Sequence, residues 1–379
     1  MSQRYDDAVI GAGIIGLAHA YHLASRGRRV VVFERHAHAR GASVRNFGML
    51  WPIGQPAGPL RDLALRSRAI WLDVLTRSGL WHDRCGSLHL AYRDDEAAVL
   101  GEFARAADAA GFPCEILEAS AVVTKCPHVR RAGLVGALWS PNETCVDPRL
   151  TLAALPLWLS ESLGVTFEFD TQITVCDPPL VLAGTQEWSA EHVWICGGDD
   201  LQTLYPDALR RAGLVRCKLQ MMRSRPMSWR LGPMLAAGLT LRHYRGFEAC
   251  PTLPAVSTRL AREWPDHARY GIHVMVSQNG RGELVIGDSH EYDDDIEPFD
   301  KSAIDGLILD YLQQYLEVTE LPIAERWHGF YVKHPSAGYL VARPAPAVVA
   351  VTGVGGAGMT MSFGIAEQVV REVVELSAG

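Results

Sequence analysis

The pattern of apolar positions in the first fifty residues predicts a strand, a helix and a second strand. The apolar run 8–10 leads directly into a glycine-rich turn, and apolar residues then recur at helical spacing from 14 to 25. A second apolar run, Val30–Phe33, ends on Glu34. This order is typical of a β-α-β unit, in which a helix follows one buried strand and returns the chain to the next.

The same reasoning predicts alternating helices and strands along the rest of the chain. Asp147 and Pro148 are residue types favoured at the N-cap and the first position of a helix, so we expect a helix to start there. The other expected elements are helices at about 60–79, 94–110 and 301–317 and at the C-terminus, and strands at 86–92, 134–139, 165–169, 193–198, 219–222, 272–277, 284–286 and 348–352.

This pattern predicts an α/β fold with two domains. One is a discontinuous Rossmann-like nucleotide-binding domain, and the other is an inserted α+β substrate domain built on a mostly antiparallel sheet. We assign 1–80, 141–215 and 326–379 to the nucleotide-binding domain, and 81–140 and 216–325 to the substrate-binding domain. A chain of 379 residues with 48% hydrophobic residues is long enough for two cores.

Charge and cysteine content narrow the range of partners. The 36 basic and 43 acidic residues give a formal net charge of -7 without a basic run, which argues against a nucleic acid partner. The eight cysteines form no C-x-x-C pair, so we expect reduced, buried thiols and no metal site. Strand 8–10 lies too close to the N-terminus for a signal peptide, and glycines break the apolar stretch 345–366. We therefore expect a cytoplasmic protein without a membrane span.

The glycine-rich turn has the spacing G-x-G-x-x-G, at Gly11, Gly13 and Gly16, between a strand and a helix. Such glycines permit a tight turn, a close approach of the backbone to a pyrophosphate, and close packing of helix on strand. Glu34 lies where a carboxylate can bind the ribose hydroxyls of an adenosine, and its charge disfavours NADP. A plain NAD domain does not require the second glycine-containing segment, 41–48, which favours the longer FAD.

Four segments resemble the D-amino-acid oxidase-like superfamily of FAD-dependent oxidoreductases, which includes glycine and sarcosine oxidases. They are GAGIIG with FER, GASVRNFG, WICGGD at 194–199 and TGVGGAGMTMSFG at 352–364. The resemblance implies that FAD is bound in an extended shape by Gly11, Gly13, Ile14, Ile15, Gly16, Glu34, Arg35, Ala42, Ser43, Arg45, Asn46, Gly48, Met49, Ile173, Gly197, Gly355, Gly356, Ala357, Gly358, Met359 and Thr360.

The mode of FAD attachment also follows from this resemblance. Sarcosine oxidases of the family attach the flavin through a late cysteine, and no cysteine follows Cys250 in this chain. Other members use a histidine near the second glycine loop, where this chain has Arg45 and Asn46. Non-covalent FAD is therefore the prediction.

The substrate region departs from the amino-acid oxidases of the superfamily. Where those enzymes carry an arginine that clamps the substrate carboxylate, this chain has Tyr331. Lys333, Arg45 or His334 is then the candidate partner of a differently placed anion, although Lys333 also fits an ordinary exposed lysine and His334 a structural role. The segment RNFGMLWPIGQPAG at 45–58 is similar to a subgroup associated with the breakdown of aminophosphonates.

We predict catalytic roles for His273 and Tyr331, and substrate contacts for Arg45, Trp51, Tyr244, Tyr331 and Lys333. His273 lies where some relatives place a lysine that promotes reaction with oxygen, and a histidine packed between strands is the alternative. His243 and Tyr244 are candidates for the roof of the pocket.

The resulting prediction is FAD-dependent oxidative deamination. A hydride passes from the α-carbon of a small anionic amine to the flavin, the imine is hydrolysed, and oxygen is the expected acceptor. The favoured substrate is an aminophosphonate such as N-methylated 2-aminoethylphosphonate. Three alternatives stay open: a glycine- or sarcosine-type amino-acid oxidase or dehydrogenase, a flavoprotein that modifies a macromolecule such as tRNA, and a non-catalytic nucleotide-binding module.

Overall fold

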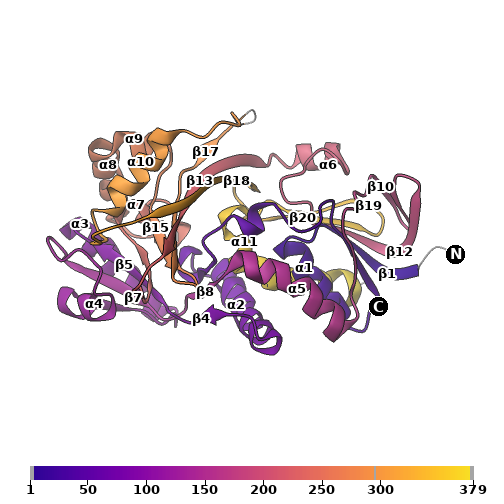
Figure 1. Ribbon diagram of the computed structural model, residues 1–379, viewed down its shortest axis with the longest axis horizontal. Helices are drawn as coiled ribbons and strands as arrows, with labels where there is room; N and C mark the ends of the chain where they lie inside the picture. Colours follow the sequence, from indigo (N-terminus) through magenta and orange to yellow (C-terminus); the bar gives the residue numbers. More distant parts are fainter. Residues whose placement is uncertain (1–3, 294–295, 376–379) are drawn as a thin grey trace.

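The computed structural model describes residues 4–293 and 296–375 and is organised around two large β-sheets. In Figure 1 the lobe built on the first sheet lies at the right and the lobe built on the second lies at the left. The predicted combination of a Rossmann-like unit and a second, mostly antiparallel sheet is confirmed.

The first sheet consists of β1 (Arg4–Ile10), β2 (Val30–Phe33), β9 (Thr166–Glu168), β10 (Val175–Asp177), β11 (Leu180–Ala183), β12 (Gln186–Ile195), β19 (Leu340–Ala345) and β20 (Val348–Thr352). Five of these strands run parallel, in the order β9, β2, β1, β12, β20. Parallel sheets are normally covered on both faces, and β2 is accordingly buried at each of its positions.

Four helices cover one face of this sheet: α1 (Ile14–Ala24), α2 (Pro59–Ser78), α5 (Pro148–Leu163) and α11 (Gly358–Val370). Their apolar side chains form one core with the strands, in which the rings of Trp71 and Phe363 meet edge to face at 4.8 Å. The opposite face is covered by a smaller core that includes Leu209 of α6 (Pro206–Arg211). Burial on both faces fixes the carboxyl ends of the parallel strands side by side.

The second sheet consists of β5 (Ser87–Ala91), β6 (Glu115–Glu118), β7 (Gly136–Ser140), β13 (Val215–Pro226), β14 (Met234–Ala236), β15 (Met275–Gln278), β16 (Glu283–Gly287), β17 (Glu291–Tyr292) and β18 (Ile323–Lys333). Its order is β17-β13-β16-β15-β14-β5-β7-β6, and β18 also pairs with β13. Within this sheet β14 and β5 pair in parallel, and the other pairings are antiparallel.

The helices of the second lobe are α3 (Asp94–Ala109), α4 (Ala119–Lys125), α7 (Gly238–Leu241), α8 (Leu253–Glu263), α9 (Pro265–Arg269) and α10 (Ser302–Leu312). Apolar residues from most of these helices share one large core with the sheet. A small third sheet is formed by β3 (Met49–Leu50), β4 (His82–Asp83) and β8 (Thr144–Val146).

Several predicted elements have different ends in the structure. The helix expected at 301–317 ends at Leu312. The strand expected at 193–198 ends at Ile195, and the chain turns at 198–199. The strand that contains the predicted domain limit at 326, β18, pairs with β13 along its length and so belongs to the second sheet. The other domain limits remain a proposal.

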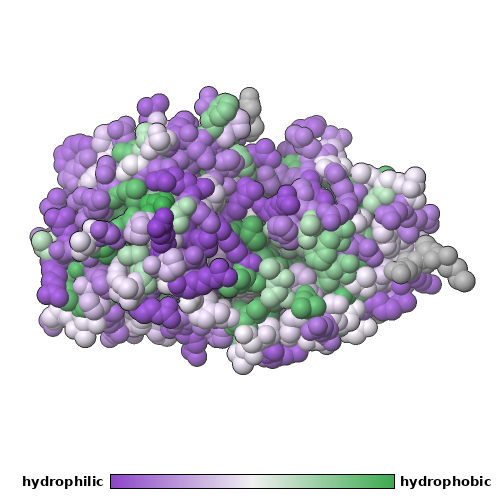
Figure 2. All heavy atoms as spheres, viewed as in Figure 1, coloured by the Kyte–Doolittle hydropathy of each residue, from purple (hydrophilic) through white to green (hydrophobic). Residues whose placement is uncertain are grey.

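The face of the molecule shown in Figure 2 is mostly hydrophilic, with hydrophobic residues gathered over the region of α5. Leu150 and Leu157 of this helix are among the exposed large hydrophobic residues. No helix in the described part of the chain has both the length and the hydrophobicity needed to cross a membrane.

Candidate active site

A cavity of about 990 Å³ begins at the carboxyl ends of the parallel strands and continues to the second sheet. Segments that follow β1, β2, β12 and β20 line its first part, including Gly11, Glu34 and Gly197. Residues of the second lobe, among them His273 and Tyr331, line its far part. Ligands of open α/β sheets bind at such strand ends, so this is the candidate site for cofactor and substrate.

The first glycine loop forms a cradle that only glycines allow. Gly11 has a φ of +107°, and a Cβ built on it would lie 2.5 Å from the carbonyl oxygen of Cys196. A Cβ on Gly16 would lie 1.9 Å from the carbonyl oxygen of Gly11. Gly16 does not line the cavity, and its part is to let α1 pack against the turn.

The amino end of α1 faces the cavity without a cap from its own N-cap residue. Gly13 occupies the N-cap position and has no side chain, and the N–H of Ile14 donates to the Ser43 hydroxyl at 3.0 Å. The positive end of a helix dipole with free backbone donors is a common binding site for a pyrophosphate. Ser43 thereby joins the second loop to the first.

Glu34 is held in a fixed orientation at the end of β2. Its two carboxylate oxygens accept hydrogen bonds from the N–H groups of Ala12 at 3.1 Å and His36 at 3.2 Å. The residue lines the cavity while being only 9% exposed. Arg35, also in the lining, pairs with Asp200 at 2.5 Å.

Asn46 holds the second glycine loop together. Its amide nitrogen donates to the carbonyl oxygens of Ala42 and Ser43, at 3.1 and 2.9 Å, and its amide oxygen accepts from the N–H of Gly48 at 2.7 Å. Gly48 has a φ of +72°, and a Cβ there would lie 2.0 Å from the carbonyl oxygen of Val146. Gly48 therefore supports the loop from behind, outside the cavity lining.

The third glycine loop, 353–358, connects β20 to α11 beside the second sheet. A Cβ on Gly355 would lie 3.1 Å from the Cβ of Lys333, and one on Gly356 would lie 3.9 Å from the Tyr331 hydroxyl. The N-cap residue of α11, Ala357, offers no side-chain cap, so this helix also presents its amino end near the cavity. The loop thus meets the predicted substrate residues.

Two aromatic residues of the substrate prediction lie on the cavity wall. Tyr331 is buried, and burial raises the pKa of its hydroxyl well above the usual range, so it remains a donor. Tyr244 also lines the cavity, and its hydroxyl donates to the sulfur of Met275 at 3.3 Å.

Trp51 lies behind this wall. Its backbone N–H donates to the Thr360 hydroxyl at 2.8 Å, and its ring lies 6.3 Å from that of Tyr244. Trp51 is not part of the cavity lining, and the predicted contact between Trp51 and the substrate stays a prediction.

Three positive side chains that bear on the substrate prediction, Arg45, Arg242 and Lys333, are in the cavity lining. The Lys333 ammonium lies 3.9 Å from the centroid of the Tyr292 ring, and Arg45 donates to the carbonyl oxygen of His328 at 3.2 Å. Arg242 lines the cavity and burial lowers the pKa of its guanidinium. In the described part of the chain neither Lys333 nor Arg242 forms an ion pair with a carboxylate.

His273 is one of three neighbouring histidines in the far part of the cavity, with His243 and His290. Burial lowers the pKa of His290 to about 4 and that of His243 well below its usual value, with further lowering by the adjoining imidazoles. Both rings are therefore neutral near pH 7. From the sequence, His243 was a candidate for the roof of the pocket. His290, Asp288 and Arg242 were missed, because no motif in the sequence relates these residues to the rest of the site.

Most of the predicted residues come together in one cavity. Those in its lining are Gly11, Gly13, Ile14, Ile15, Glu34, Arg35, Ala42, Ser43, Arg45, Asn46, Ile173, Gly197, Tyr244, His273, Tyr331, Lys333, Gly355, Gly356, Ala357, Gly358 and Met359. Those outside it are Gly16, Gly48, Met49, Trp51 and Thr360. His334 also lines the cavity, and its Nδ1 accepts from the N–H groups of Ser336 and Ala337, which gives it a structural part in a turn.

The cavity fits the predicted FAD in three respects. The first glycine loop leaves space that a side chain would fill, the N-cap residues of α1 and α11 offer no side-chain cap, and the Glu34 carboxylate is oriented by two backbone donors. These features suit a pyrophosphate, a flavin that becomes negative on reduction, and ribose hydroxyls, respectively. All three features lie in the lining of one continuous cavity.

Comparison with known proteins gives the same assignment. A family model described as FAD dependent oxidoreductase matches residues 6–372. The glycine oxidase of Geobacillus kaustophilus is 29% identical over 177 residues, which are 45% of this chain and 47% of that protein. The monomeric sarcosine oxidase of Streptomyces avermitilis is 28% identical over 199 residues, 52% of this chain and 51% of that protein. The matched regions thus span about half the length of these two relatives.

A solved structure shows the same fold over almost the whole chain. The crystal structure of glycine oxidase from Geobacillus kaustophilus superposes with a TM-score of 0.78 and covers 99% of this chain and 95% of that one, at 20% identity. At this identity the similarity shows the fold alone.

Proposed function

The chain belongs to the family of FAD-dependent oxidoreductases, and we propose that it oxidises the C–N bond of a small amine that carries an anionic group. FAD is the cofactor, and it supplies the two-electron oxidant by accepting the hydride that leaves the α-carbon. The imine product is then hydrolysed to an aldehyde and an amine or ammonia.

The observation that carries this proposal is a pair of cations in the cavity lining, Lys333 and Arg242, that have no carboxylate partner among residues 4–293 and 296–375. Lys333 adjoins Gly355, and Arg242 lines the same cavity at partial burial. A half-buried cation without a counter-ion is costly, and a bound anion would offset that cost. Tyr331, which replaces the carboxylate-clamping arginine of the amino-acid oxidases, leaves the anion to be bound from these other positions.

In this reaction the protein orients the substrate and excludes water from the cavity. The Tyr331 hydroxyl stays protonated and can donate a hydrogen bond at the third glycine loop. Tyr244 also lines the cavity, and its hydroxyl donates to the sulfur of Met275. Because their pKa values are lowered by burial, His243 and His290 carry no charge of their own that could bind the anion near pH 7.

Within this class we favour an aminophosphonate, such as N-methylated 2-aminoethylphosphonate. Its dianionic group suits two cations better than a monoanionic carboxylate does. The segment 45–58, similar to the aminophosphonate subgroup, contributes Arg45 to the same cavity. We further propose non-covalent binding of FAD, oxygen as the electron acceptor and a cytoplasmic location.

A glycine- or sarcosine-type oxidase is the second candidate. It is favoured by the two relatives that carry these activities in their names. Lys333 or Arg242 would then bind the carboxylate that an arginine clamps in amino-acid oxidases.

The test is anaerobic reduction of the bound flavin by a panel of amines. We expect bleaching of the flavin absorbance by 2-aminoethylphosphonate or its N-methyl derivative at lower concentrations than by glycine, sarcosine or uncharged alkylamines. Rapid bleaching by glycine and sarcosine, with none by the aminophosphonates, would reject the narrow proposal and keep the second candidate. Absence of bleaching by every amine would reject both.

A further inference from the structure

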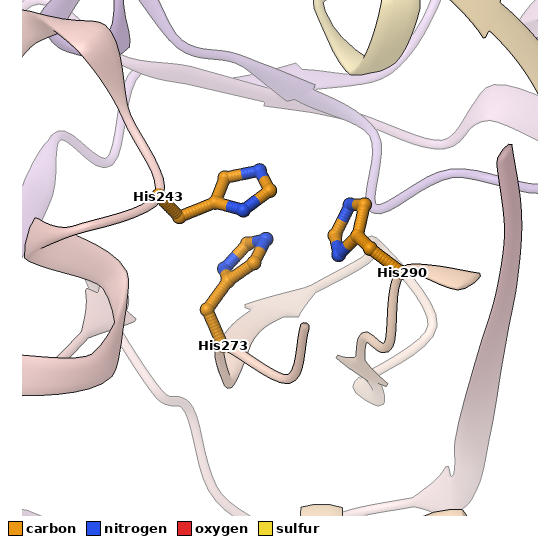
Figure 3. Close-up of side chains that lie close together, drawn as sticks. All are labelled: His243, His273 and His290. Carbon is orange, nitrogen blue, oxygen red and sulfur yellow. The ribbon is translucent and has the colours of Figure 1, made fainter. Parts of the chain in front are cut away.

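Three imidazoles converge from separate segments of the second lobe. His243 follows α7, His273 precedes β15 and His290 follows β16. Figure 3 shows the rings turned toward a common space. One nitrogen of each ring lies within 4.8 Å of the corresponding nitrogen of the other two. All three residues line the cavity described above.

The hydrogen bond of His290 leaves a specific nitrogen available. Its Nδ1 lies 3.0 Å from the carbonyl oxygen of Gly271. A carbonyl oxygen only accepts, so Nδ1 carries the proton and Nε2 of the neutral ring carries the lone pair. Histidines that bind metal ions usually donate their second ring N–H to a carbonyl or carboxylate in this way.

His273 lies beside a carboxylate. Its Nε2 is 3.1 Å from Oδ1 of Asp288, an ion-pair distance at which Oδ1 does not form a hydrogen bond. Its Nδ1 is buried and has no hydrogen-bond partner in the described part of the chain, while the residue as a whole is only 2% exposed. A buried ring nitrogen without a partner carries a desolvation cost that a ligand would remove. The ring of His243 lies over that of His273 with centroids 3.7 Å apart.

We propose that His243, His273 and His290 bind one divalent transition-metal ion, with Asp288 orienting His273 from the second coordination shell. Three neutral imidazoles are a common ligand set for Zn²⁺, whereas Mg²⁺ and Ca²⁺ require oxygen ligands. Binding would bring the nitrogen atoms, now within 4.8 Å of one another, closer together, because nitrogens that share a metal at about 2.1 Å lie roughly 3.4 Å apart in tetrahedral geometry.

Such an ion would have an open position, since the three histidines leave one tetrahedral site on the cavity side. On the basis of the proposed function, that position accepts an oxygen of the anionic group of the substrate. The ion would act beside Lys333 as an anchor, away from the two-electron chemistry of the flavin. The metal site itself follows from the three histidines and requires no particular substrate.

The test measures metal content in the absence of substrate. The FAD-loaded protein is treated with chelator, desalted, incubated with excess Zn²⁺, desalted again and analysed for zinc and flavin by mass spectrometry and absorbance. We expect about one Zn²⁺ per chain. The H290Q and H273Q variants should lose it, and D288N should bind Zn²⁺ roughly 10- to 100-fold more weakly.

The control is H267Q, which removes a buried histidine that bonds to the carbonyl oxygen of Leu307 outside the cavity. This variant should retain zinc as the unmodified chain does. Retained flavin shows in each case that the variant is folded. FAD-loaded wild-type protein without stoichiometric zinc, or H290Q with as much zinc as wild type, would overturn the proposal. Since no amine is present, either result is independent of the substrate panel.

Discussion

Replacing Lys333 with methionine tests the proposed binding of an anionic group. Methionine keeps an unbranched chain of similar length and removes the charge, and the existing contact with the Tyr292 ring involves no carboxylate. A hydrogen bond to a charged group contributes about 1.5–3 kcal/mol, so the Michaelis constant or dissociation constant of an anionic amine should rise roughly 10- to 100-fold. An uncharged amine of the same length should be affected little, because it makes no use of the ammonium.

The assay is anaerobic flavin reduction by stopped flow, with both amines and with K301M as the control variant. Lys301 pairs with Glu291 and does not line the cavity, so its replacement removes a lysine of the same lobe without touching the proposed site. An equal loss for charged and uncharged amines in K333M would refute the reasoning, because it would show a general structural effect. The same loss in K301M would do so as well.

Two further predictions follow from the cofactor cradle and from a buried carboxyl group. G16A should purify with little or no FAD and with a lower Tm, because the added Cβ would lie 1.9 Å from the carbonyl oxygen of Gly11. Overpacking of this kind costs about 1–3 kcal/mol of folding stability. Normal flavin content in G16A would contradict the role assigned to Gly16. Burial raises the pKa of Glu143 from 4.5 to about 7, so the folded state holds a proton that the unfolded state has released between these values, and stability falls as pH rises through this window. E143Q stays neutral and can still accept a hydrogen bond from the N–H of Ile53. Measured by urea unfolding, the free energy of unfolding of E143Q relative to wild type should therefore rise by about 3 kcal/mol between pH 4 and pH 8. A difference independent of pH would show that Glu143 titrates normally.

The cofactor half of the site was predictable because its geometry is local. The spacing of Gly11 and Gly16 reflects a turn whose atoms belong to a few neighbouring residues, and Glu34 ends the very next strand. Backbone sterics alone therefore restrict these positions to particular residues. The Rossmann-like sheet, its order of segments and the family were recovered on this basis and are confirmed.

The substrate half depends on contacts between distant segments. His290 and Arg242 reach the cavity through the strand order of the second sheet, and no spacing in the sequence relates them. Trp51 lies outside the cavity lining, and its backbone N–H donates to the hydroxyl of Thr360, a residue far away in the sequence.

Element ends were misjudged for a related reason. Tyr315 and Leu316 continue the apolar pattern of α10 and are buried, although the helix has ended at Leu312. Tertiary burial can thus extend a helical pattern of hydrophobic residues beyond the helix itself. The strand β18 was missed because only three of its eleven residues are buried, which leaves a weak pattern of hydrophobic residues.

The most direct test of the central claim is a single-turnover comparison of one pair of amines under anaerobic conditions. N-methyl-2-aminoethylphosphonate and an uncharged N-methylalkylamine of the same length are mixed separately with the FAD-loaded protein, and loss of flavin absorbance is followed with time. We expect bleaching by the anionic amine at concentrations roughly 10- to 100-fold below those needed for the uncharged one. Equal bleaching by both, or bleaching by the uncharged amine alone, would contradict it.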